Sequence, residues 1–328
     1  MRDRSPSIKA LLALVALTCL TVAATDSTGG SKLPASKLSA ADKSADGEPA
    51  AAAACDAENL QAVHATLDGE VITPPVTATM LVDGREMQLR TLHDELQLTY
   101  VHNLLSAEEM ASLLRLAEGR NGFARSPLKT QRSGADASGD ARRNSSSCPM
   151  LWPLVYEGRE DELRATGERA AGLLEELALV SNLTSRVAEL FTQTGMELSN
   201  RFIEPLQLVR YQPSELFSPH HDYHEPAADG SLGSSVQGEQ RAFTVLFFGA
   251  TLPPGDGGET HFPHLKLKVS PTLGDAIVWS NVDEEGAPNP RSLHEGRPPA
   301  RGEKVAVNCW IADREFDLKG GMQKAVVT

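Results

Sequence analysis

Five short apolar segments in the second half of the chain constrain its fold more than any other feature. They are LQLVRY, TVLFFGA, LKLKVS, DAIVWS and VAVNCWI, which are rich in β-branched or aromatic residues and separated by Gly, Pro, Asp and Asn. Segments of this kind predict short strands joined by turns. The periodicity ahead of Gly195 is helical instead. Helices followed by many short strands predict an α+β protein with a β-sandwich or a jelly roll.

Three helices are predicted ahead of these strands. The first lies within NLLSAEEMASLLRLAEGR, where Ser106 and Glu109 form a capping box and Gly119 marks the end. Residues 160–180 are expected to form the second helix and residues 185–195 the third, because their apolar residues recur at helical spacing.

Composition divides the chain into five parts. Residues 1–24 combine a basic start with an uncharged run that is too short to span a bilayer, which favours a cleaved signal peptide over a type II membrane anchor. Residues 25–54 contain no aromatic residue and predict a disordered low-complexity stalk. Residues 55–95 are an N-terminal extension with short β segments, residues 96–313 the compact domain, and residues 314–328 a C-terminal tail.

Charge and cysteine usage narrow the setting. The formal net charge of -13 disfavours a nucleic-acid partner, because an acidic surface repels phosphates. Either form of the leader would direct the domain to the secretory pathway, in the endoplasmic reticulum or Golgi lumen. There Cys55, Cys148 and Cys309 could provide one disulfide, whose pairing stays open. Asn144 and Asn182 begin glycosylation sequons that matter only in that lumen.

The stretch SPHHDYHEP is a candidate metal site. In an extended chain His220 and Asp222 share a face and His221 points away. The third ligand would be His224 or a residue from a distant strand. Two histidines and a carboxylate on one octahedral face leave the open positions that non-heme Fe(II) oxygen chemistry needs. A solvated polar loop is the alternative for this motif taken alone.

Lys304 adds a second chemical requirement. Alternation along KVAVNCWI places Val305, Val307, Cys309 and Ile311 on a packing face and Lys304 on the opposite face, toward the inside of the barrel. Burying an ammonium group is costly unless it meets an anion. A dicarboxylate co-substrate would supply that anion.

These motifs, in this order, resemble the prolyl 4-hydroxylase family of 2-oxoglutarate- and Fe(II)-dependent dioxygenases over residues 96–313. The matching segments are Y-x5-F-x2-H-x-D from Tyr211 to Asp222, R-x-x-T-V-L from Arg241, GGETHFP from Gly257, P-x-x-GDA from Pro271, SLH ending at His294 and GEK ending at Lys304. The resemblance implies a double-stranded β-helix, or jelly-roll, core with supporting N-terminal helices.

The resemblance also implies site roles. His220, Asp222 and His294 would bind Fe(II), and Lys304 would bind the distal carboxylate of 2-oxoglutarate with help from Tyr211 and Thr244. The residues expected to border a peptide substrate are Phe217, Arg241 and Trp310. Arg143 lies where the family has an R-x-S segment, although a solvated role fits it equally well. Val305 and Ser214 depart from residues common in the family, which makes details of the peptide site less transferable.

The implied reaction hydroxylates peptidyl proline to 4-hydroxyproline while 2-oxoglutarate and O2 are converted to succinate and CO2, with L-ascorbate keeping the iron reduced. The expected substrate is a proline-rich or collagen-like polypeptide, the only expected membrane contact is an N-terminal anchor, and the oligomeric state is open. The alternatives are hydroxylation of another residue or of a small molecule at the same iron site, and a non-catalytic luminal binding module with this fold.

Overall fold

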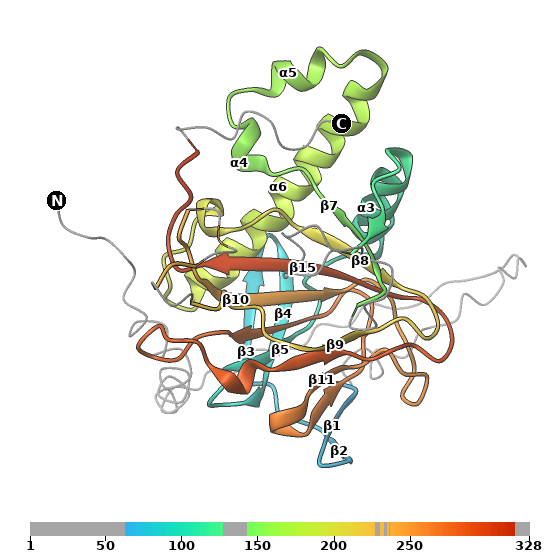
Figure 1. Cartoon of the computed structure of the whole chain (residues 1–328), viewed down its shortest axis with the longest axis vertical. Coiled ribbons are helices and arrows are strands. Elements are labelled where there is room, and N and C mark those ends of the chain that lie inside the picture. The colour runs from blue at the N-terminus through green and yellow to red at the C-terminus, as the bar shows by residue number, and fades with distance from the viewer. Residues whose placement is uncertain (1–62, 127–142, 227–229, 233–234, 236, 319–328) are drawn as a thin grey trace, which may run out of the picture.

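The computed structural model describes residues 63–126, 143–226, 230–232, 235 and 237–318 (Figure 1). The predicted leader, the predicted stalk and Cys55 lie outside the described residues. Within the described part, no helix combines the length and the apolar character needed to cross a membrane.

Two antiparallel sheets form the body of the protein. The six-stranded sheet has the order β2-β1-β12-β11-β14-β9 and the nine-stranded sheet the order β3-β4-β5-β13-β10-β15-β8-β7-β6. In the smaller sheet the strands are β1 (Ala65–Leu67), β2 (Glu70–Ile72), β9 (Phe217–His220), β11 (Thr260–Phe262), β12 (Leu267–Val269) and β14 (His294–Gly296). In the larger they are β3 (Ala78–Val82), β4 (Arg85–His93), β5 (Leu98–Val101), β6 (Ala124–Arg125), β7 (Ser146–Pro149), β8 (Gln207–Tyr211), β10 (Arg241–Phe248), β13 (Ala276–Ser280) and β15 (Lys304–Ala312).

The helices cover the outer face of the nine-stranded sheet, and the six-stranded sheet faces its other side (Figure 1). They are α3 (Ala107–Gly119), α4 (Pro153–Tyr156), α5 (Glu160–Arg164) and α6 (Ala170–Gln193), with short 3-10 turns η3 (Gly167–Arg169), η4 (Asn200–Phe202), η5 (Pro263–Leu265) and η6 (Pro290–Ser292). This layering confirms the α+β jelly roll with supporting helices.

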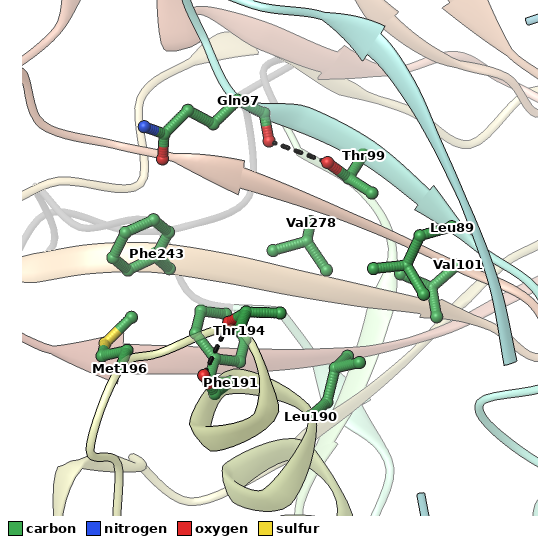
Figure 2. Close-up of a pocket in the computed structure, with 10 residues that line it drawn as sticks. All are labelled: Leu89, Gln97, Thr99, Val101, Leu190, Phe191, Thr194, Met196, Phe243 and Val278. Atoms are coloured by element: carbon green, nitrogen blue, oxygen red, sulfur yellow. Dashed lines mark hydrogen bonds between the residues drawn. The ribbon is translucent and has the colours of Figure 1, made fainter. Parts of the chain in front are cut away.

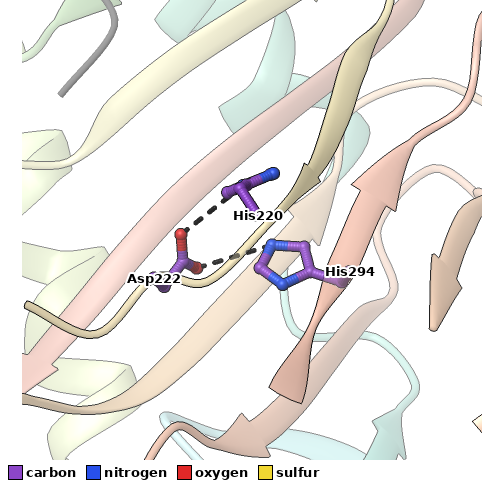
Figure 3. Close-up of side chains that lie close together, drawn as sticks. All are labelled: His220, Asp222 and His294. Atoms are coloured by element: carbon purple, nitrogen blue, oxygen red, sulfur yellow. Dashed lines mark ion pairs between the residues drawn. The ribbon is translucent and has the colours of Figure 1, made fainter. Parts of the chain in front are cut away.

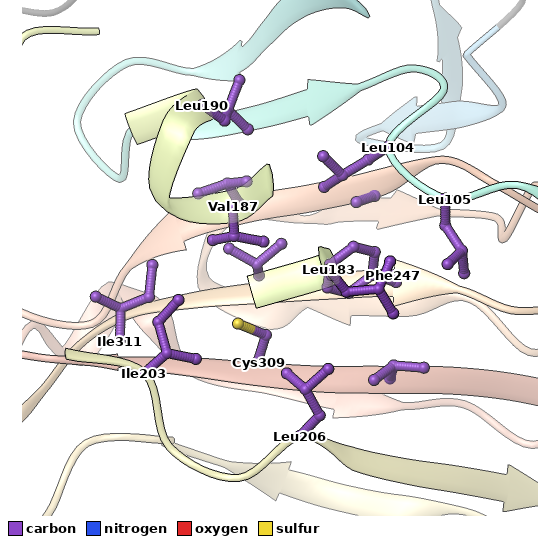
Figure 4. Packing of buried hydrophobic residues seen from close by; sticks show 14 of the residues in the cluster. Leu104, Leu105, Leu183, Val187, Leu190, Ile203, Leu206, Phe247, Cys309 and Ile311 are labelled. Carbon is purple, nitrogen blue, oxygen red and sulfur yellow. The ribbon is translucent and has the colours of Figure 1, made fainter. Parts of the chain in front are cut away.

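Strand β15 divides its side chains between two cores. Val305, Val307, Cys309 and Ile311 pack in the core beneath the helices, as the alternation predicts, and Figure 4 shows Cys309 and Ile311 there. Ala306 belongs to the core between the sheets instead. The helix-side core also leaves a small apolar cavity of about 60 Å³ whose lining includes Leu190, Phe243 and Val278 (Figure 2).

Helix α3 begins at the predicted capping box. The Ser106 hydroxyl accepts from the Glu109 N–H at 3.1 Å, and the Glu109 carboxylate accepts from the Ser106 N–H at 2.8 Å. The same carboxylate binds Arg186 of α6, which is 3% exposed and also pairs with Asp83. Its guanidinium further donates to the Leu104 carbonyl, so one buried cation joins α6 to α3 and to the β3–β4 turn.

The prediction of separate helices over 160–180 and 185–195 is wrong. Helix α5 ends at Arg164, and Gly167 follows it with φ +68, a backbone conformation that residues with a side chain rarely adopt. Beyond it α6 runs unbroken, because Leu177, Val180, Leu183 and Val187 keep one buried face across the SNLT segment. Gly195 follows the helix with φ +94, as expected for a residue that ends it.

The two sheets extend beyond the predicted domain start at Leu96. Strand β1 lies between β2 and β12, and β4 pairs with β5, so residues 63–95 contribute to both sheets rather than forming an extension. The start of the predicted tail is also packed, because Phe316 is 1% exposed and contacts Trp152 edge to face. These segments depend on partners far away in sequence, which local alternation does not reveal.

Cys148 and Cys309 are both free and buried. A disulfide between these two is therefore absent. The Asn144 side chain accepts from the Leu216 N–H at 2.7 Å, and Asn182 is exposed on α6.

Candidate metal and co-substrate site

His220, Asp222 and His294 come together between the sheets (Figure 3). His220 ends β9 and His294 begins β14, and the two residues are direct cross-strand partners, so both rings project from the same face. One ligand atom from each of the three residues lies within 4.8 Å of the other two. Asp222 Oδ1 is 3.7 Å from His220 Nε2, and Asp222 Oδ2 is 3.7 Å from His294 Nε2. Separate chain segments thus form a two-histidine, one-carboxylate cluster.

Backbone carbonyls fix the tautomer of both imidazoles in the form that can bind a metal through Nε2. His220 Nδ1 lies 2.8 Å from the Ser218 carbonyl, and His294 Nδ1 lies 2.9 Å from the Ser292 carbonyl. A carbonyl only accepts hydrogen bonds, so each Nδ1 carries the proton and each Nε2 offers its lone pair toward Asp222. Burial, reinforced by the His294 ring, holds the pKa of His220 well below its usual range. The neutral form that binds metal is therefore favoured.

Asp222 is held by a relay of buried polar side chains. The Thr244 hydroxyl donates to Asp222 Oδ2 at 2.8 Å, and Asn281 Nδ2 donates to that hydroxyl at 2.8 Å. The Trp279 indole N–H donates to Asn281 Oδ1 at 2.9 Å. The resemblance assigned Thr244 to the co-substrate, and in the structure its hydroxyl donates to the Asp222 carboxylate. Sequence reasoning missed Asn281 and Trp279, since they lie on β13 and the turn after it, far along the chain from Asp222.

The other histidines of the motif lie outside the cluster. His221 stacks on Tyr223, and its Nε2 lies 3.2 Å from the Pro290 carbonyl. His224 is buried near Glu204 and Glu239 instead. The histidine that lies with His220 and Asp222 is His294, from a distant strand.

Lys304 is buried beside the cluster. It is 2% exposed, and its Nζ donates to the Glu259 backbone oxygen at 3.4 Å and lies 5.4 Å from the centroid of the Tyr211 ring. Among the described residues no carboxylate lies within ion-pair distance of this amine. Burial lowers the pKa of Lys304 to about 8, a cost that the nearby Glu259 only partly offsets. A buried ammonium without a carboxylate is suited to an anionic ligand.

Two arginines, Arg241 and Arg143, each lie over an aromatic ring beside the cluster of His220, Asp222 and His294. Arg241 makes two 2.7 Å bonds to Glu204, and its guanidinium lies 3.7 Å from the Trp310 ring centroid. Phe217 stacks on the His220 ring at 3.5 Å.

Arg143 covers the Phe217 ring, with its guanidinium 4.3 Å from the centroid. It is 7% exposed, so the solvated reading of this residue is wrong. Arg143 is buried because it forms an isolated antiparallel β-bridge with Phe217 of β9, which places the Arg143 segment over the site.

Comparison with known proteins agrees with this geometry. Residues 206–312 match the model of the 2OG-Fe(II) oxygenase superfamily, a range that contains His220, Asp222, His294 and Lys304. Prolyl 4-hydroxylase 13 of Arabidopsis thaliana is 32% identical over 189 residues, which are 52% of this chain and 65% of that protein. Prolyl 4-hydroxylase 1 of the same plant is 28% identical over 149 residues, 42% of this chain and 48% of that protein. Over part of its length the chain is therefore similar to prolyl 4-hydroxylases and to the 2OG-Fe(II) oxygenase superfamily.

These similarities agree with the predicted resemblance and with the cluster of His220, Asp222 and His294. The chain covers 48% and 65% of these two relatives and 46% of a relative from Acanthamoeba polyphaga mimivirus. Among solved structures, the viral collagen prolyl hydroxylase of Paramecium bursaria Chlorella virus-1 is 20% identical, with a TM-score of 0.45 over 66% of this chain and 95% of that one.

Proposed function

We propose that the chain is a 2-oxoglutarate- and Fe(II)-dependent dioxygenase that hydroxylates carbon 4 of proline in polypeptides. The observation that carries the proposal is the pairing of a His-Asp-His cluster with a buried lysine that lacks a carboxylate partner among the described residues. The cluster suits Fe(II) with open coordination positions, and the lysine suits the distal carboxylate of 2-oxoglutarate.

With Fe(II) and 2-oxoglutarate bound, the site would supply oxidative hydroxylation. One atom of O2 enters the proline C–H bond as a hydroxyl group, and the other enters succinate as 2-oxoglutarate loses CO2. The chain itself contributes binding and orientation. His220, Asp222 and His294 would hold the metal, and the 2.8 Å hydrogen bond from Thr244 would keep the Asp222 carboxylate oriented toward it.

A proline-containing peptide fits the surroundings of the cluster. Phe217 and Trp310, which are both partly exposed and each stacked with a guanidinium group, offer apolar surface against which a pyrrolidine ring would pack. Extended proline-rich segments bind aromatic-lined grooves in the same way, because their backbone is already ordered. The names of the prolyl 4-hydroxylase relatives support this substrate class, and we extend it to proline-rich or collagen-like polypeptides.

A turnover assay tests the proposal. We expect the full chain, supplied with Fe(II), ascorbate, 2-oxoglutarate and a proline-rich peptide, to release succinate in proportion to a gain of one oxygen atom on proline. His294→Ala should abolish both products, while His221→Ala, which changes an imidazole outside the cluster, should retain them. If oxygen were incorporated into lysine peptides or a small molecule instead, proline would be rejected as the substrate. Absence of succinate with every substrate would favour a binding module instead.

We propose further that this reaction takes place in the lumen of the endoplasmic reticulum or Golgi, with ascorbate as reductant. The support is the basic and apolar composition of residues 1–24. Expression of the full chain in cells, followed by protease protection of intact vesicles, tests the location. Digestion of the domain without detergent would contradict it.

A further inference from the structure

Trp279 fixes the direction of the hydrogen-bond relay that ends on Asp222. Its indole N–H can only donate, so it must meet the Asn281 amide oxygen, which lies 2.9 Å away. The Asn281 amide nitrogen then faces the Thr244 hydroxyl at 2.8 Å and donates to it. A hydroxyl carries a single proton, and that of Thr244 is donated to Asp222 Oδ2, also at 2.8 Å. The indole therefore determines how the Asp222 carboxylate is held.

This relay is closed to solvent. Trp279 is 1% exposed, and the side chains of Thr244 and Asn281 are fully buried. A hydrogen bond between buried groups does not compete with bulk water, and leaving one of its partners unsatisfied is costly. Removal of one member should therefore change the position of the next member.

The backbone of Asn281 leads to a second member of the cluster. Its carbonyl accepts from the Asn289 N–H at 3.0 Å. The Asn289 carbonyl accepts from the Ser292 N–H at 3.0 Å and from the Ser292 hydroxyl at 2.8 Å. The Ser292 carbonyl is the group that lies 2.9 Å from His294 Nδ1 and fixes the tautomer of that ring. Asn281 is thus connected to Asp222 through its side chain and to His294 through its backbone.

Trp279 also contacts His294 directly. The two ring centroids lie 4.8 Å apart at an interplanar angle of 64°, the edge-to-face arrangement that aromatic pairs favour. The Asn281 N–H donates to the Ala242 carbonyl at 2.8 Å, which anchors the turn to β10 two residues before Thr244. Trp279 and Asn281 therefore support two of the three residues of the cluster without belonging to it.

We propose that Trp279 and Asn281 are positioning residues that couple Asp222 to His294 and so set the affinity of the cluster for a divalent metal ion. Ligands that are already held in place bind a metal more tightly than ligands that must first be ordered. The inference rests on the proposed function, because it takes His220, Asp222 and His294 as the metal ligands.

Binding of Co(II) alone tests this role. The ion is titrated into the full chain without 2-oxoglutarate, its dissociation constant is measured by calorimetry, and His220→Ala defines the background binding to the acidic surface. Asn281→Ala should weaken Co(II) binding roughly ten- to a hundredfold, the usual effect of removing a residue that orients a metal ligand. The visible absorption bands of the bound Co(II) should change as well, since the ligands are rearranged.

Trp279→Phe is the more conservative variant. It keeps an aromatic ring beside His294 and removes only the indole N–H. We expect it to weaken Co(II) binding roughly three- to tenfold, the net worth of one hydrogen bond. In a Thr244→Val background the same change should have little further effect, because the indole acts on Asp222 through that hydroxyl.

Trp152→Phe is the matched control. The Trp152 indole N–H is also buried and donates to the Ile203 carbonyl at 2.9 Å, in a separate small core with Phe316. This variant should lose a comparable amount of thermal stability and keep the Co(II) affinity of the wild type. Thermal unfolding of each metal-free variant shows that it is folded, and Trp279→Phe decides the test if Asn281→Ala is not.

The outcomes separate the two proposals. If the wild type binds Co(II) no better than His220→Ala does, the metal site of the proposed function fails. If the wild type binds Co(II) and Trp279→Phe binds it equally well, the coupling alone is wrong. An equal loss of affinity in Trp152→Phe would assign the effect to general stability, and an undiminished effect of Trp279→Phe in the Thr244→Val background would overturn the relay.

Discussion

Replacing Lys304 with methionine should make the ligand-free protein more stable while removing its affinity for 2-oxoglutarate. Methionine keeps a flexible unbranched side chain of similar length and removes the charge. Lys304 is 2% exposed and has no carboxylate partner among the described residues, so the change removes a buried cation without leaving a buried anion behind. The usual loss from breaking a buried ion pair is therefore not expected.

The size of the gain follows from the lysine pKa. Burial lowers that pKa from 10.5 to about 8 in the folded protein. At pH 7 the amine is charged in both states, and the pKa difference corresponds to a cost of about 3 kcal/mol in the free energy of unfolding. As pH rises through 8 the folded protein loses this proton before the unfolded chain does. The advantage of the variant should then fall to about 2 kcal/mol at pH 9 and below about 1 kcal/mol at pH 10.

Urea unfolding of both proteins at pH 7, 9 and 10, with and without 2-oxoglutarate and Mn(II), measures this difference. The co-substrate should stabilise the wild type and leave the variant unchanged. Lys266→Met is the control, because the Lys266 side chain is 72% exposed and should show no such pH dependence. A Lys304→Met protein that is less stable than wild type at pH 7, or a difference independent of pH, would refute the reasoning.

Three further predictions concern Lys304, Arg186 and Gly249. The apparent affinity for 2-oxoglutarate should drop about tenfold between pH 7 and pH 9 by calorimetry, because the carboxylate needs the protonated form of Lys304, whose pKa is about 8; a flat profile would contradict this. Arg186→Met should cost about 3–5 kcal/mol in urea unfolding by leaving Glu109 without its buried partner, whereas Arg115→Met at an exposed pair should cost little. Gly249→Ala should cost about 1–3 kcal/mol, because its Cβ would lie 2.8 Å from a Val305 methyl carbon; Gly119→Ala, with nothing within 4 Å, should not.

The proximity of His220 and Asp222 could be predicted from the sequence because it is local and follows strand alternation. His220 and Asp222 share a face through their spacing, and the chemistry of the buried Lys304 implied an anionic co-substrate nearby. His294 entered through its order in a family pattern. Its contact with His220 depends on strand pairing between β9 and β14, which the sequence does not display.

The contacts that could not be predicted from the sequence join residues far apart in the chain. Asn281 and Trp279 support Asp222 through Thr244, but nothing in their own segment reveals which acceptor they meet. Arg143 is a charged residue in a polar segment, where a solvent-exposed side chain is the usual expectation. It is buried because its segment forms a bridge to Phe217. The single helix α6 was divided in the prediction because SNLT is weak in helix propensity, while burial of Leu183 and its neighbours sustains it.

The pairing of β1 with β12 also constrains how the chain acquires its fold. Ala65 lies opposite Val269, and β4 reaches the central strands only through β5, whose partner β13 comes just as late in the chain. A chain emerging from the ribosome N-terminus first would present these early strands long before their partners exist. Their unpaired edges can bind other chains during that interval. Synthesis at a slower rate would lengthen this exposure, so the rate of elongation becomes a variable in the yield of folded protein.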